Sequence, residues 1–355
     1  MFLHKARRAL MALALLLPAV ACAGFADVLD TPAGMSPLAS HGLLNGVALA
    51  GKRVVAVGQR GQVVYSDDAG ASWRQAAVPV ASDLVAVCFP TPQQGWAVGH
   101  DGVVLHSSDG GATWARQLDG RRVGQLMLEQ LHASAAGDPS GSGADAAASR
   151  DEVERIAAQG AENPFLDVWF ADEHNGYIVG AFNLIFHTTD GGQSWVSWFD
   201  RTDNPDRLHL YAVRGIGSDV YITGEQGLLL KLDRQSDRFR AIQTPYKGTY
   251  FGVVGTRDAV VVYGLRGNAY RSSDAGAHWL AVDTGIQEGI TGGTVFGAQG
   301  LALVSQAGSL LVSHDSGEHF TVYRQAKPVP SSAVAVVGDV VVTAGALGVK
   351  TQASH

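Results

Sequence analysis

Apolar residues in this chain occur in short runs that polar turns separate. Leu84–Phe89, Gly95–Val98 and Val103–Ser107 are such runs, rich in aliphatic and β-branched residues and too short for typical helices. A turn that contains an aspartate follows the third run, and Trp114 then begins a fourth. The pattern predicts a unit of four short β-strands joined by tight turns.

This unit repeats along the chain. Its third turn carries the phrase Ser or Thr, x, Asp, x, Gly, x, x, Trp or Phe. The aspartate and aromatic pairs of the five full copies are Asp68 and Trp73, Asp109 and Trp114, Asp190 and Trp195, Asp274 and Trp279, and Asp315 and Phe320. Asp68 and Asp109 lie 41 residues apart, as do Asp274 and Asp315. A fixed period near 40 with strand-like contents indicates a propeller or a solenoid.

A second column of residues has the same period. Each unit contains a turn with small residues three positions apart. The seven turns are Gly58 to Gly61, Gly99 to Gly102, Gly180 to Asn183, Gly224 to Gly227, Gly264 to Gly267, Ser305 to Gly308 and Gly345 to Gly348. Glycine and asparagine suit turns that need a positive φ. One turn for each unit predicts seven units.

We therefore predict an all-β fold, a seven-bladed β-propeller of four-stranded blades over residues 27–355. The expected blades are 41–79, 80–120, 163–200, 206–245, 246–285, 287–325 and 328–352. The last has only three strands, so we expect the segment 27–40 to supply its outer strand and close the ring. In the fourth blade Asp233 and Phe239 hold the repeat positions without the glycine, which predicts a looser turn.

The innermost strands show a column of mostly small residues when they are aligned on the turn glycine. These residues are Gly46, Ala86, Val168, Ala212, Gly252, Gly293 and Ala333. Inner strands converge on the propeller axis, so small side chains there indicate a packing requirement.

Residues 121–162 form an insertion between the second and third blades. Val123, Leu126 and Met127 lie at helical spacing, and Ser149-x-x-Glu152 has the form of a capping box. We predict a helical hairpin on the same face of the propeller as the glycine-flanked turns. It either packs on the ring, or serves as a docking arm or a cap over the central channel.

The first residues have the order of a secretory signal. Three cations at positions 5, 7 and 8 precede the apolar run 9–23, and small residues offer cleavage after Ala23 or Ala26. We expect a signal peptide over 1–26 and a periplasmic or secreted protein; a buried strand is the alternative. Ala19 is a poor match to a lipobox, which argues against a lipoprotein anchored through Cys22. Cleavage leaves Cys88 without a disulfide partner.

Charge and motif content exclude several classes of function. Removal of residues 1–26 takes away three cations and no acids, so the net charge of −7 becomes −10. This argues against nucleic acid, which needs a cationic face. The twelve histidines form no metal-ligand pattern, and we expect no metal, no cofactor and no catalytic residue. The repeated aspartates are expected to accept hydrogen bonds from their own turns, with the aromatic residue packed between sheets.

The residues inside the seven turns vary in type while their flanking glycines do not. Mixed charged, amide and aromatic groups on one face suit a protein-binding surface; ordinary solvated turns are the alternative. The candidate partner-binding residues are Arg60, His100, Asp101, Phe182, Glu225, Gln226, Arg266 and Gln306.

The run from Gly99 to Trp114 resembles the photosystem II stability/assembly factor family of Asp-box propellers, also called bacterial neuraminidase repeat propellers. The resemblance covers essentially the whole mature chain. It implies a non-catalytic periplasmic scaffold that binds and helps to assemble or stabilise an integral membrane protein complex. The helical insertion looks like that of non-photosynthetic bacterial members, which are associated with resistance-nodulation-division type transporters. We expect a monomer.

A secreted sialidase-like glycoside hydrolase or glycan-binding propeller is the alternative function, because sialidases share the Asp-box. Their Arg-Ile-Pro motif does not occur here. Asp101, Asp167 and Glu225 could be proposed as the paired carboxylates of a glycosidase, but no spacing singles them out.

Overall fold

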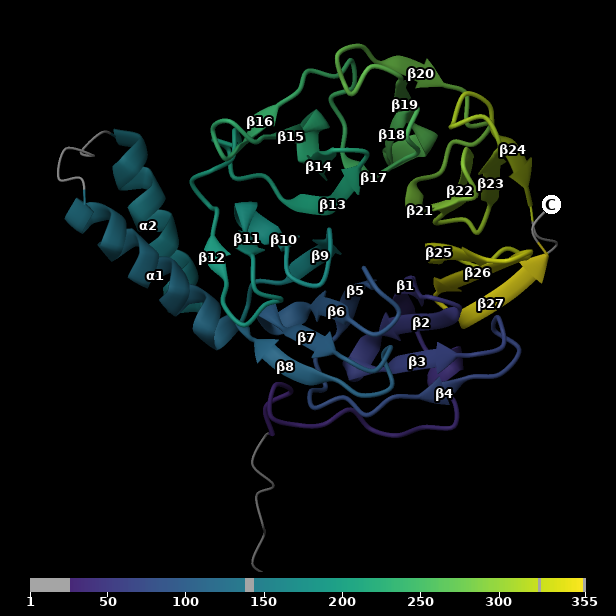
Figure 1. The fold of residues 1–355 in the computed structure, drawn as a ribbon, viewed down its shortest axis with the longest axis horizontal. Helices are drawn as coiled ribbons and strands as arrows, with labels where there is room; N and C mark the ends of the chain where they lie inside the picture. The colour runs from purple at the N-terminus through teal and green to yellow at the C-terminus, as the bar shows by residue number, and fades with distance from the viewer. Residues whose placement is uncertain (1–25, 138–143, 325–326, 354–355) are drawn as a thin grey trace, which may run out of the picture.

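The computed structural model describes residues 26–137, 144–324 and 327–353, and its strands form seven separate sheets arranged in a ring (Figure 1). Six sheets have four strands and the seventh has three. Consecutive strands in each sheet pair antiparallel, as in β1 with β2 and β2 with β3. The predicted seven-bladed β-propeller is confirmed. Six sheets lie within their expected ranges, and the seventh ends at Ala353, one residue beyond its range.

The strands run outward from the axis in chain order within each blade. Blades 1 to 3 contain β1 (Leu44–Ala50), β2 (Arg53–Gly58), β3 (Val63–Ser66), β4 (Arg74–Gln75), β5 (Leu84–Cys88), β6 (Gly95–Gly99), β7 (Val104–Ser107), β8 (Ala115–Leu118), β9 (Phe165–Phe170), β10 (Gly176–Gly180), β11 (Ile185–Thr188) and β12 (Val196–Ser197). Blades 4 and 5 contain β13 (Leu210–Ile216), β14 (Asp219–Gly224), β15 (Leu229–Asp233), β16 (Arg238–Ala241), β17 (Tyr250–Gly255), β18 (Val260–Gly264), β19 (Ala269–Ser272) and β20 (Leu280–Val282). Blades 6 and 7 contain β21 (Ile290–Phe296), β22 (Gly300–Ser305), β23 (Leu310–Ser313), β24 (Thr321–Tyr323), β25 (Ser331–Val337), β26 (Val340–Gly345) and β27 (Gly348–Ala353).

The second strand of each blade is apolar on both faces because a neighbouring blade covers each face. All five residues of β6 and all five of β10 are buried. This explains why these strands read as continuous apolar runs rather than as alternating patterns. The outer strands are short and mostly exposed.

Each Asp-box is a closed hydrogen-bonded turn. In blade 2 the Ser107 hydroxyl donates to the Asp109 carboxylate (2.9 Å) and accepts from the Gly111 amide (2.8 Å). The same carboxylate accepts from the Thr113 amide (2.9 Å), and the Trp114 indole donates to the Gly111 carbonyl (3.0 Å). The hydrogen bonds have the predicted form, and Trp114 is buried.

The degenerate turn of blade 4 is shorter than the Asp-boxes, not looser as predicted. Only residues 234–237 separate β15 from β16. The Asp233 carboxylate accepts from the Gln235 amide (3.0 Å) and the Ser236 hydroxyl (2.6 Å). Without the box glycine, the chain turns back directly into β16.

The prediction that residues 27–40 complete blade 7 is wrong. Blade 7 has three strands among the described residues, and residues 26–43 contain no strand, only a 3-10 turn, η1 (Ala39–His41). The segment crosses blade 1 instead: the Gln75 side chain accepts from the Ser36 amide (2.7 Å) and donates to the Gly34 carbonyl (2.9 Å). Pro32 and Pro37 lack the N–H donors of a strand ladder.

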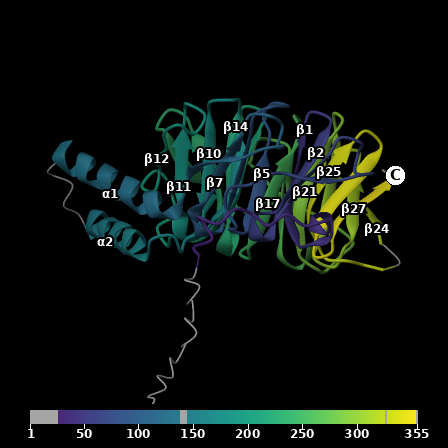
Figure 2. The ribbon, with the colours of Figure 1, turned by 90° about the horizontal axis from the view of Figure 1, so that it is seen from below.

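The predicted insertion is a pair of helices, α1 (Gly120–Gly137) and α2 (Ala144–Gln159), that contact each other. Figures 1 and 2 show the hairpin extending outward from the rim. The expectation of a cap over the channel is therefore wrong. The capping box is wrong too: α2 begins at Ala144, so Ser149 lies within the helix, and Glu152 pairs with Arg155 (2.5 Å).

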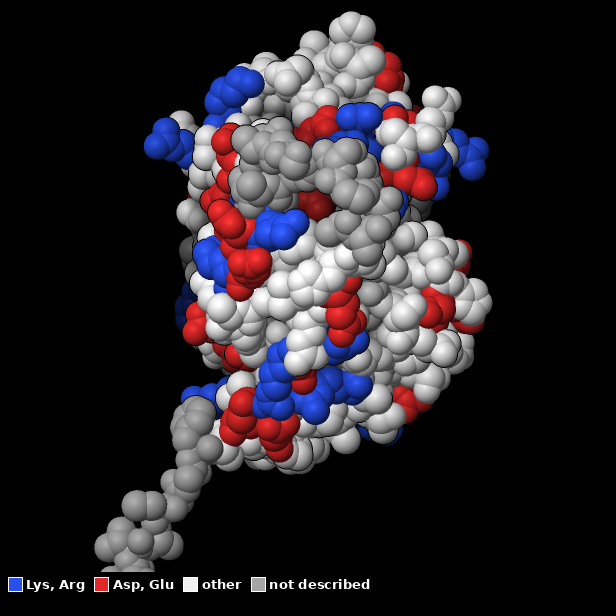
Figure 3. All heavy atoms as spheres, turned by 90° about the vertical axis from the view of Figure 1, so that its left-hand side faces the viewer, with Lys and Arg blue, Asp and Glu red and all other residues white. Residues whose placement is uncertain are grey.

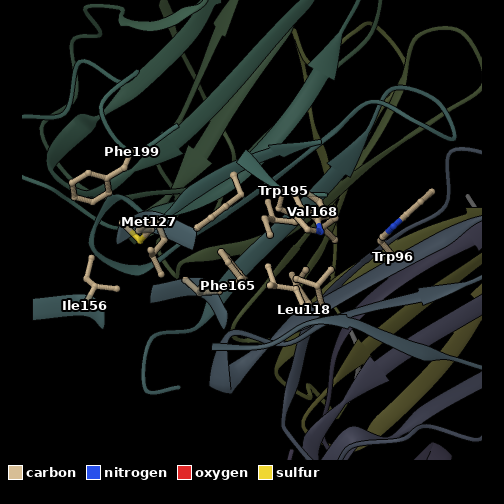
Figure 4. Packing of buried hydrophobic residues seen from close by; sticks show 14 of the residues in the cluster. Trp96, Leu118, Met127, Ile156, Phe165, Val168, Trp195 and Phe199 are labelled. Atoms are coloured by element: carbon tan, nitrogen blue, oxygen red, sulfur yellow. The ribbon is translucent and has the colours of Figure 1, made fainter. Parts of the chain in front are cut away.

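The base of the hairpin belongs to the core between blades 2 and 3. Met127 and Ile156 are almost fully buried in one cluster with Phe165 and Phe199 (Figure 4). The Gln130 amide donates to the Ser197 carbonyl (2.7 Å) and accepts from its N–H (2.9 Å). Gln130 thereby pairs the backbone of the outer strand β12, which would otherwise be an open edge.

Replacement of Ser107 tests the Asp-box. We expect Ser107→Ala to lower the free energy of unfolding by about 1–3 kcal/mol, because the buried Gly111 amide loses its acceptor. Ser107→Thr is the matched control, since Thr188 accepts from the Gly192 amide (2.9 Å) in blade 3. Urea unfolding measures both, and equal stability of the two variants would contradict the assignment.

The Asp-boxes also predict an acid dependence of stability. Hydrogen bonds from the Ser72 hydroxyl and amide and from Ser66 lower the pKa of Asp68 from 3.8 to about 2. A pKa that is lower in the folded state contributes stability above the unfolded value, which is lost as the pH falls through the folded value. We expect unfolding free energy to decrease between about pH 4 and pH 2. Asp68→Asn should flatten this slope, and an unchanged slope would refute the cause.

Candidate partner-binding site

The glycine-flanked turns lie at one end of the ring, which we name the turn face. Five of them are 3-10 turns: η2 (Gln59–Gly61), η3 (His100–Gly102), η4 (Ala181–Asn183), η5 (Glu225–Gly227) and η6 (Leu265–Gly267). The two glycines that flank a turn are required for different reasons. Gly61 has a φ of +69°, whereas Gly58 is extended and a Cβ there would lie 2.2 Å from the Leu43 carbonyl oxygen.

The middle residue of each 3-10 turn is also left-handed, although none is a glycine. Their φ values are 56° at Arg60, 58° at Asp101, 52° at Phe182, 53° at Gln226 and 58° at Arg266. Such residues are strained, and strain of this kind gathers at functional sites. The left-handed conformation of these middle residues could not be predicted from the sequence, because their residue types vary from turn to turn.

Contacts with the next blade hold these turns in place. The Arg60 amide donates to the Asp83 carboxylate (2.7 Å). The Phe182 ring packs edge-on against His209, with centroids 4.6 Å apart, and the His209 amide donates to the Glu225 carboxylate (2.9 Å). Phe182 and Glu225 therefore meet through His209.

The other candidate residues divide into two groups. His100 and Gln306 line a cavity on the propeller axis. Arg60, Asp101, Gln226 and Arg266 are spread around the turn face, and no hydrogen bond or ion pair joins their side chains within the described residues. The turn face is thus a broad surface around a central mouth.

The central cavity has a volume of about 520 Å³. Seven of the residues that line it come one from each inner strand, and each is the second residue of its strand, at a break in the pairing register. They are Asn45, Val85, Leu166, Tyr211, Phe251, Thr291 and Ser332. A β-bulge re-aims a side chain. Sequence reasoning missed this ring of bulges because the residue types share nothing.

The bulges also correct the register of the small-residue column. Gly46 pairs with Val57 directly after the bulge of blade 1, and the equivalent residues of blades 3 and 6 are Asp167 and Gly292. The predicted members Val168 and Gly293 are each wrong by one position. Six blades therefore have glycine or alanine next to the axis, and blade 3 has an aspartate.

Asp167 forms an ion pair across the junction of blades 3 and 4. Its side chain is 5% exposed, and it accepts hydrogen bonds from the Arg214 guanidinium and the Val213 amide. Burial alone would lower the pKa of Arg214, but the Asp167 carboxylate outweighs burial and raises it. The guanidinium is therefore charged, and it is 39% exposed towards the cavity.

The cavity gives the glycosidase alternative no support. Among the described residues that line it, Asp167 is the one carboxylate, and it is engaged by Arg214. Glycoside hydrolysis normally needs two carboxyl groups. Asp101 and Glu225 lie in turns of other blades. In the described ranges no group of three metal-ligating side chains comes together.

The rim beside the helical hairpin carries interleaved charges of both signs (Figure 3). Arg121 pairs with Asp27 (2.6 Å) and Asp30 (2.8 Å), and Arg122 pairs with Glu129 (2.6 Å). The two Arg121 pairs tie the segment that precedes blade 1 to the start of α1, whereas the Arg122 pair lies within that helix. None of the helices in the described part of the chain has the length and hydropathy of a membrane span.

Comparison with known proteins decides the family. The family described as photosynthesis system II assembly factor YCF48 matches residues 30–108, 67–135 and 147–299 of this chain. These ranges cover more than half of it. The chain belongs to this family, as its resemblance predicted.

Individual relatives are distant. A photosystem II assembly lipoprotein Ycf48 from Synechococcus sp. (strain CC9902) is 29% identical over 126 residues, 34% of this chain and 36% of that protein. The protein of the same name from Prochlorococcus marinus is 48% identical over 42 residues, 12% of each chain. The matches thus span about a third or less of these relatives.

Solved structures of the family share the fold over almost their whole length. A YCF48 bound to D1 peptide has a TM-score of 0.62 at 15% identity and covers 92% of this chain and 99% of that one. YCF48 from Cyanidioschyzon merolae has a TM-score of 0.62 at 17% identity, with coverages of 89% and 97%. At these identities the likeness shows the propeller fold alone.

The Asp167–Arg214 pair predicts a double-variant effect on stability. Arg214→Val should lower the free energy of unfolding by about 2–3 kcal/mol, because it leaves a buried carboxylate unpaired; partial exposure of Arg214 keeps the loss below the range for a fully buried pair. Asp167→Ala with Arg214→Val should recover most of that loss, since alanine or glycine stands at the Asp167 position in the other blades. Urea unfolding tests this, and a double variant less stable than Arg214→Val would contradict it.

Proposed function

We propose that this protein is an exported, non-catalytic assembly factor that binds a segment of an integral membrane protein on its turn face. The ring of seven bulged residues around the central mouth carries the proposal. It is a built concave surface at the end of the propeller where the strained turns also lie. Membership of an assembly-factor family, with a relative that is bound to a D1 peptide, supports a peptide segment of a partner as the ligand.

The chemistry of the mouth suits a protein segment. Tyr211 and Phe251 pack edge-to-face, with ring centroids 5.7 Å apart, and offer apolar anchors. His100, Gln306 and Thr291 beside them offer hydrogen bonds. Aromatic anchors within a polar rim are typical of protein interfaces.

The helical hairpin is the proposed docking arm of the same face. Its helix α1 contacts η3, and the Arg155 guanidinium of α2 lies over the Phe182 ring of η4 at 5.1 Å. Hairpin and turn face can therefore contact one partner together. A resistance-nodulation-division type transporter is the first partner to test.

The proposed compartment is the periplasm or the exterior. The signal that supports it, residues 1–26, falls almost entirely outside the described residues, as does Cys22. Cys88 is the free cysteine of the described part, and burial raises the pKa of its thiol. A thiol with a raised pKa is a poor nucleophile and needs no reducing compartment.

Charge reversal on the turn face tests the proposal. We expect the double variant Arg60→Glu and Arg266→Glu to lower recovery of the membrane partner at least about fivefold, since each substitution replaces an exposed cation of the proposed binding surface by an anion. The measurement is affinity purification of the tagged protein from detergent-solubilised envelopes, with identification by mass spectrometry.

The matched control is Lys52→Glu with Arg257→Glu. It makes the same charge change in the same two blades, but in the hairpins at the opposite end of the ring. Equal loss of the partner in both double variants would refute the turn face as the binding surface. Failure to recover any membrane protein with the unaltered chain would refute the proposed function.

A further inference from the structure

An Asp-box links its blade to the blade before it. In four of the Asp-boxes the carbonyl of the residue after the aspartate accepts a hydrogen bond from the preceding blade. The donor and acceptor pairs are Arg53 with Gly110 (3.2 Å), Gln117 with Gly191 (2.9 Å), Tyr221 with Ala275 (3.1 Å) and Arg271 with Ser316 (3.0 Å). The box glycine also packs on the second strand of that blade, for example Gly111 on Val55. The box therefore covers the flank of its neighbour.

Blade 4 has no such box, so the flank of blade 3 stays uncovered. Its short turn replaces the box and leaves a cavity of about 780 Å³ between the two blades. This cavity, the blade 3–4 slot, is walled by Trp169, Tyr177, His187 and Trp198 of blade 3 and by Val220 and Leu232 of blade 4. Its size is that of a small-molecule site.

The slot is lined by a buried tyrosine whose hydroxyl has no hydrogen-bond partner among the described residues. Tyr177 stands three residues before Gly180, as Tyr221 stands three before Gly224. The Tyr221 hydroxyl donates to the Ala275 carbonyl of the next box. Tyr177 is only 7% exposed, yet among the described residues its hydroxyl forms no hydrogen bond. Burial raises its pKa to about 12, so the hydroxyl is a neutral donor. This hydroxyl is not among the polar atoms that lie sealed from solvent without a partner, so it is open to the slot and can donate to a molecule bound there.

Aromatic rings pack against one another in the blade 3 wall, and the rings of Trp169 and His187 are partly exposed. His187 stacks on Tyr177 with centroids 4.4 Å apart, and Trp198 packs edge-on against Tyr177 at 5.4 Å. Burial, and then Arg201, lower the pKa of His187. The imidazole is therefore neutral near pH 7, with one donor and one acceptor nitrogen.

The lip of the slot has balanced charge. Arg201 and Arg234 oppose Asp172 and Asp237, and Asn175 lies among them. Of these, the Arg201 guanidinium and the Asp237 carboxylate form no hydrogen bond or ion pair with the described residues; Arg201 lies over the Trp198 ring at 5.0 Å. An anion would meet the two carboxylates and a cation the two guanidinium groups. A purely apolar side chain would leave the Tyr177 hydroxyl and the lip unpaired.

We propose that the blade 3–4 slot binds an uncharged oligosaccharide. A sugar ring has an apolar C–H face that can pack on the partly exposed rings of Trp169 and His187. Its hydroxyls both donate and accept, so they can pair with Tyr177, Arg201 and Asp237. The site lies between two blades and away from the central cavity, and it does not depend on the proposed partner binding on the turn face.

Titration calorimetry of the purified full chain with chitotetraose, cellotetraose and maltotetraose tests the site, at concentrations that detect a dissociation constant of about 1 mM. We expect saturable binding of at least one of them. Tyr177→Phe and Arg201→Ala should each weaken it about 5- to 10-fold through loss of one hydrogen-bonding group. Trp198→Ala removes a wall but also a buried side chain, so the test depends on the two milder variants.

Tyr221→Phe is the matched control. It should lower the melting temperature, because its hydroxyl is bonded to Ala275, and leave saccharide binding unchanged. Tyr177→Phe should weaken saccharide binding and leave the melting temperature unchanged. Absence of binding to all three saccharides would overturn the proposal. So would binding that neither Tyr177→Phe nor Arg201→Ala weakens, or preferential binding of N-acetylphenylalanine amide, which would assign the slot to a peptide side chain.

Discussion

The fit of each blade against its neighbour is the constraint on which the rest of this structure depends. A propeller blade has two large apolar faces and cannot bury either one alone. Near the axis the blades meet through glycine and alanine, as at Gly46, where a Cβ would lie 3.0 Å from the Val85 carbonyl oxygen. At the rim they meet through Asp-boxes such as that of Asp109, which accept hydrogen bonds from the preceding blade.

Departures from this regular contact mark the features with functional interest. Asp167 replaces a small residue next to the axis, and Arg214 of the next blade neutralises it within the central cavity. The missing box of blade 4 opens the slot beside Tyr177. The helical hairpin interrupts the connection from blade 2 to blade 3 and buries Met127 and Ile156 against the ring. In each case one blade departs from the repeated contact. The departure leaves a charged group, a cavity or an additional element that the other blades lack.

Much of the fold could be predicted from spacing because the repeat has strong local causes. Asp109 and Trp114 are needed wherever the box turn forms, and Gly61 wherever the turn needs a positive φ. Prediction failed where hydrogen-bond pairing between strands determined the register, or whether a segment forms a strand at all. A bulge shifts the register by one residue, so Val168 was taken for Asp167. The segment with Pro32 and Pro37 was expected to be a strand and instead crosses blade 1.

Local sequence patterns specify the number of blades, the Asp-boxes, the place of the insertion and the family, because each depends on residues that lie close together along the chain. Which residues surround the axis and which flank of a blade is uncovered depend on the tertiary structure. The ring from Asn45 to Ser332 takes one residue from each blade, and the blade 3–4 slot joins Tyr177 to Arg234. The chemistry of these two sites arises from side chains that ring closure brings together, so no local sequence pattern predicts it.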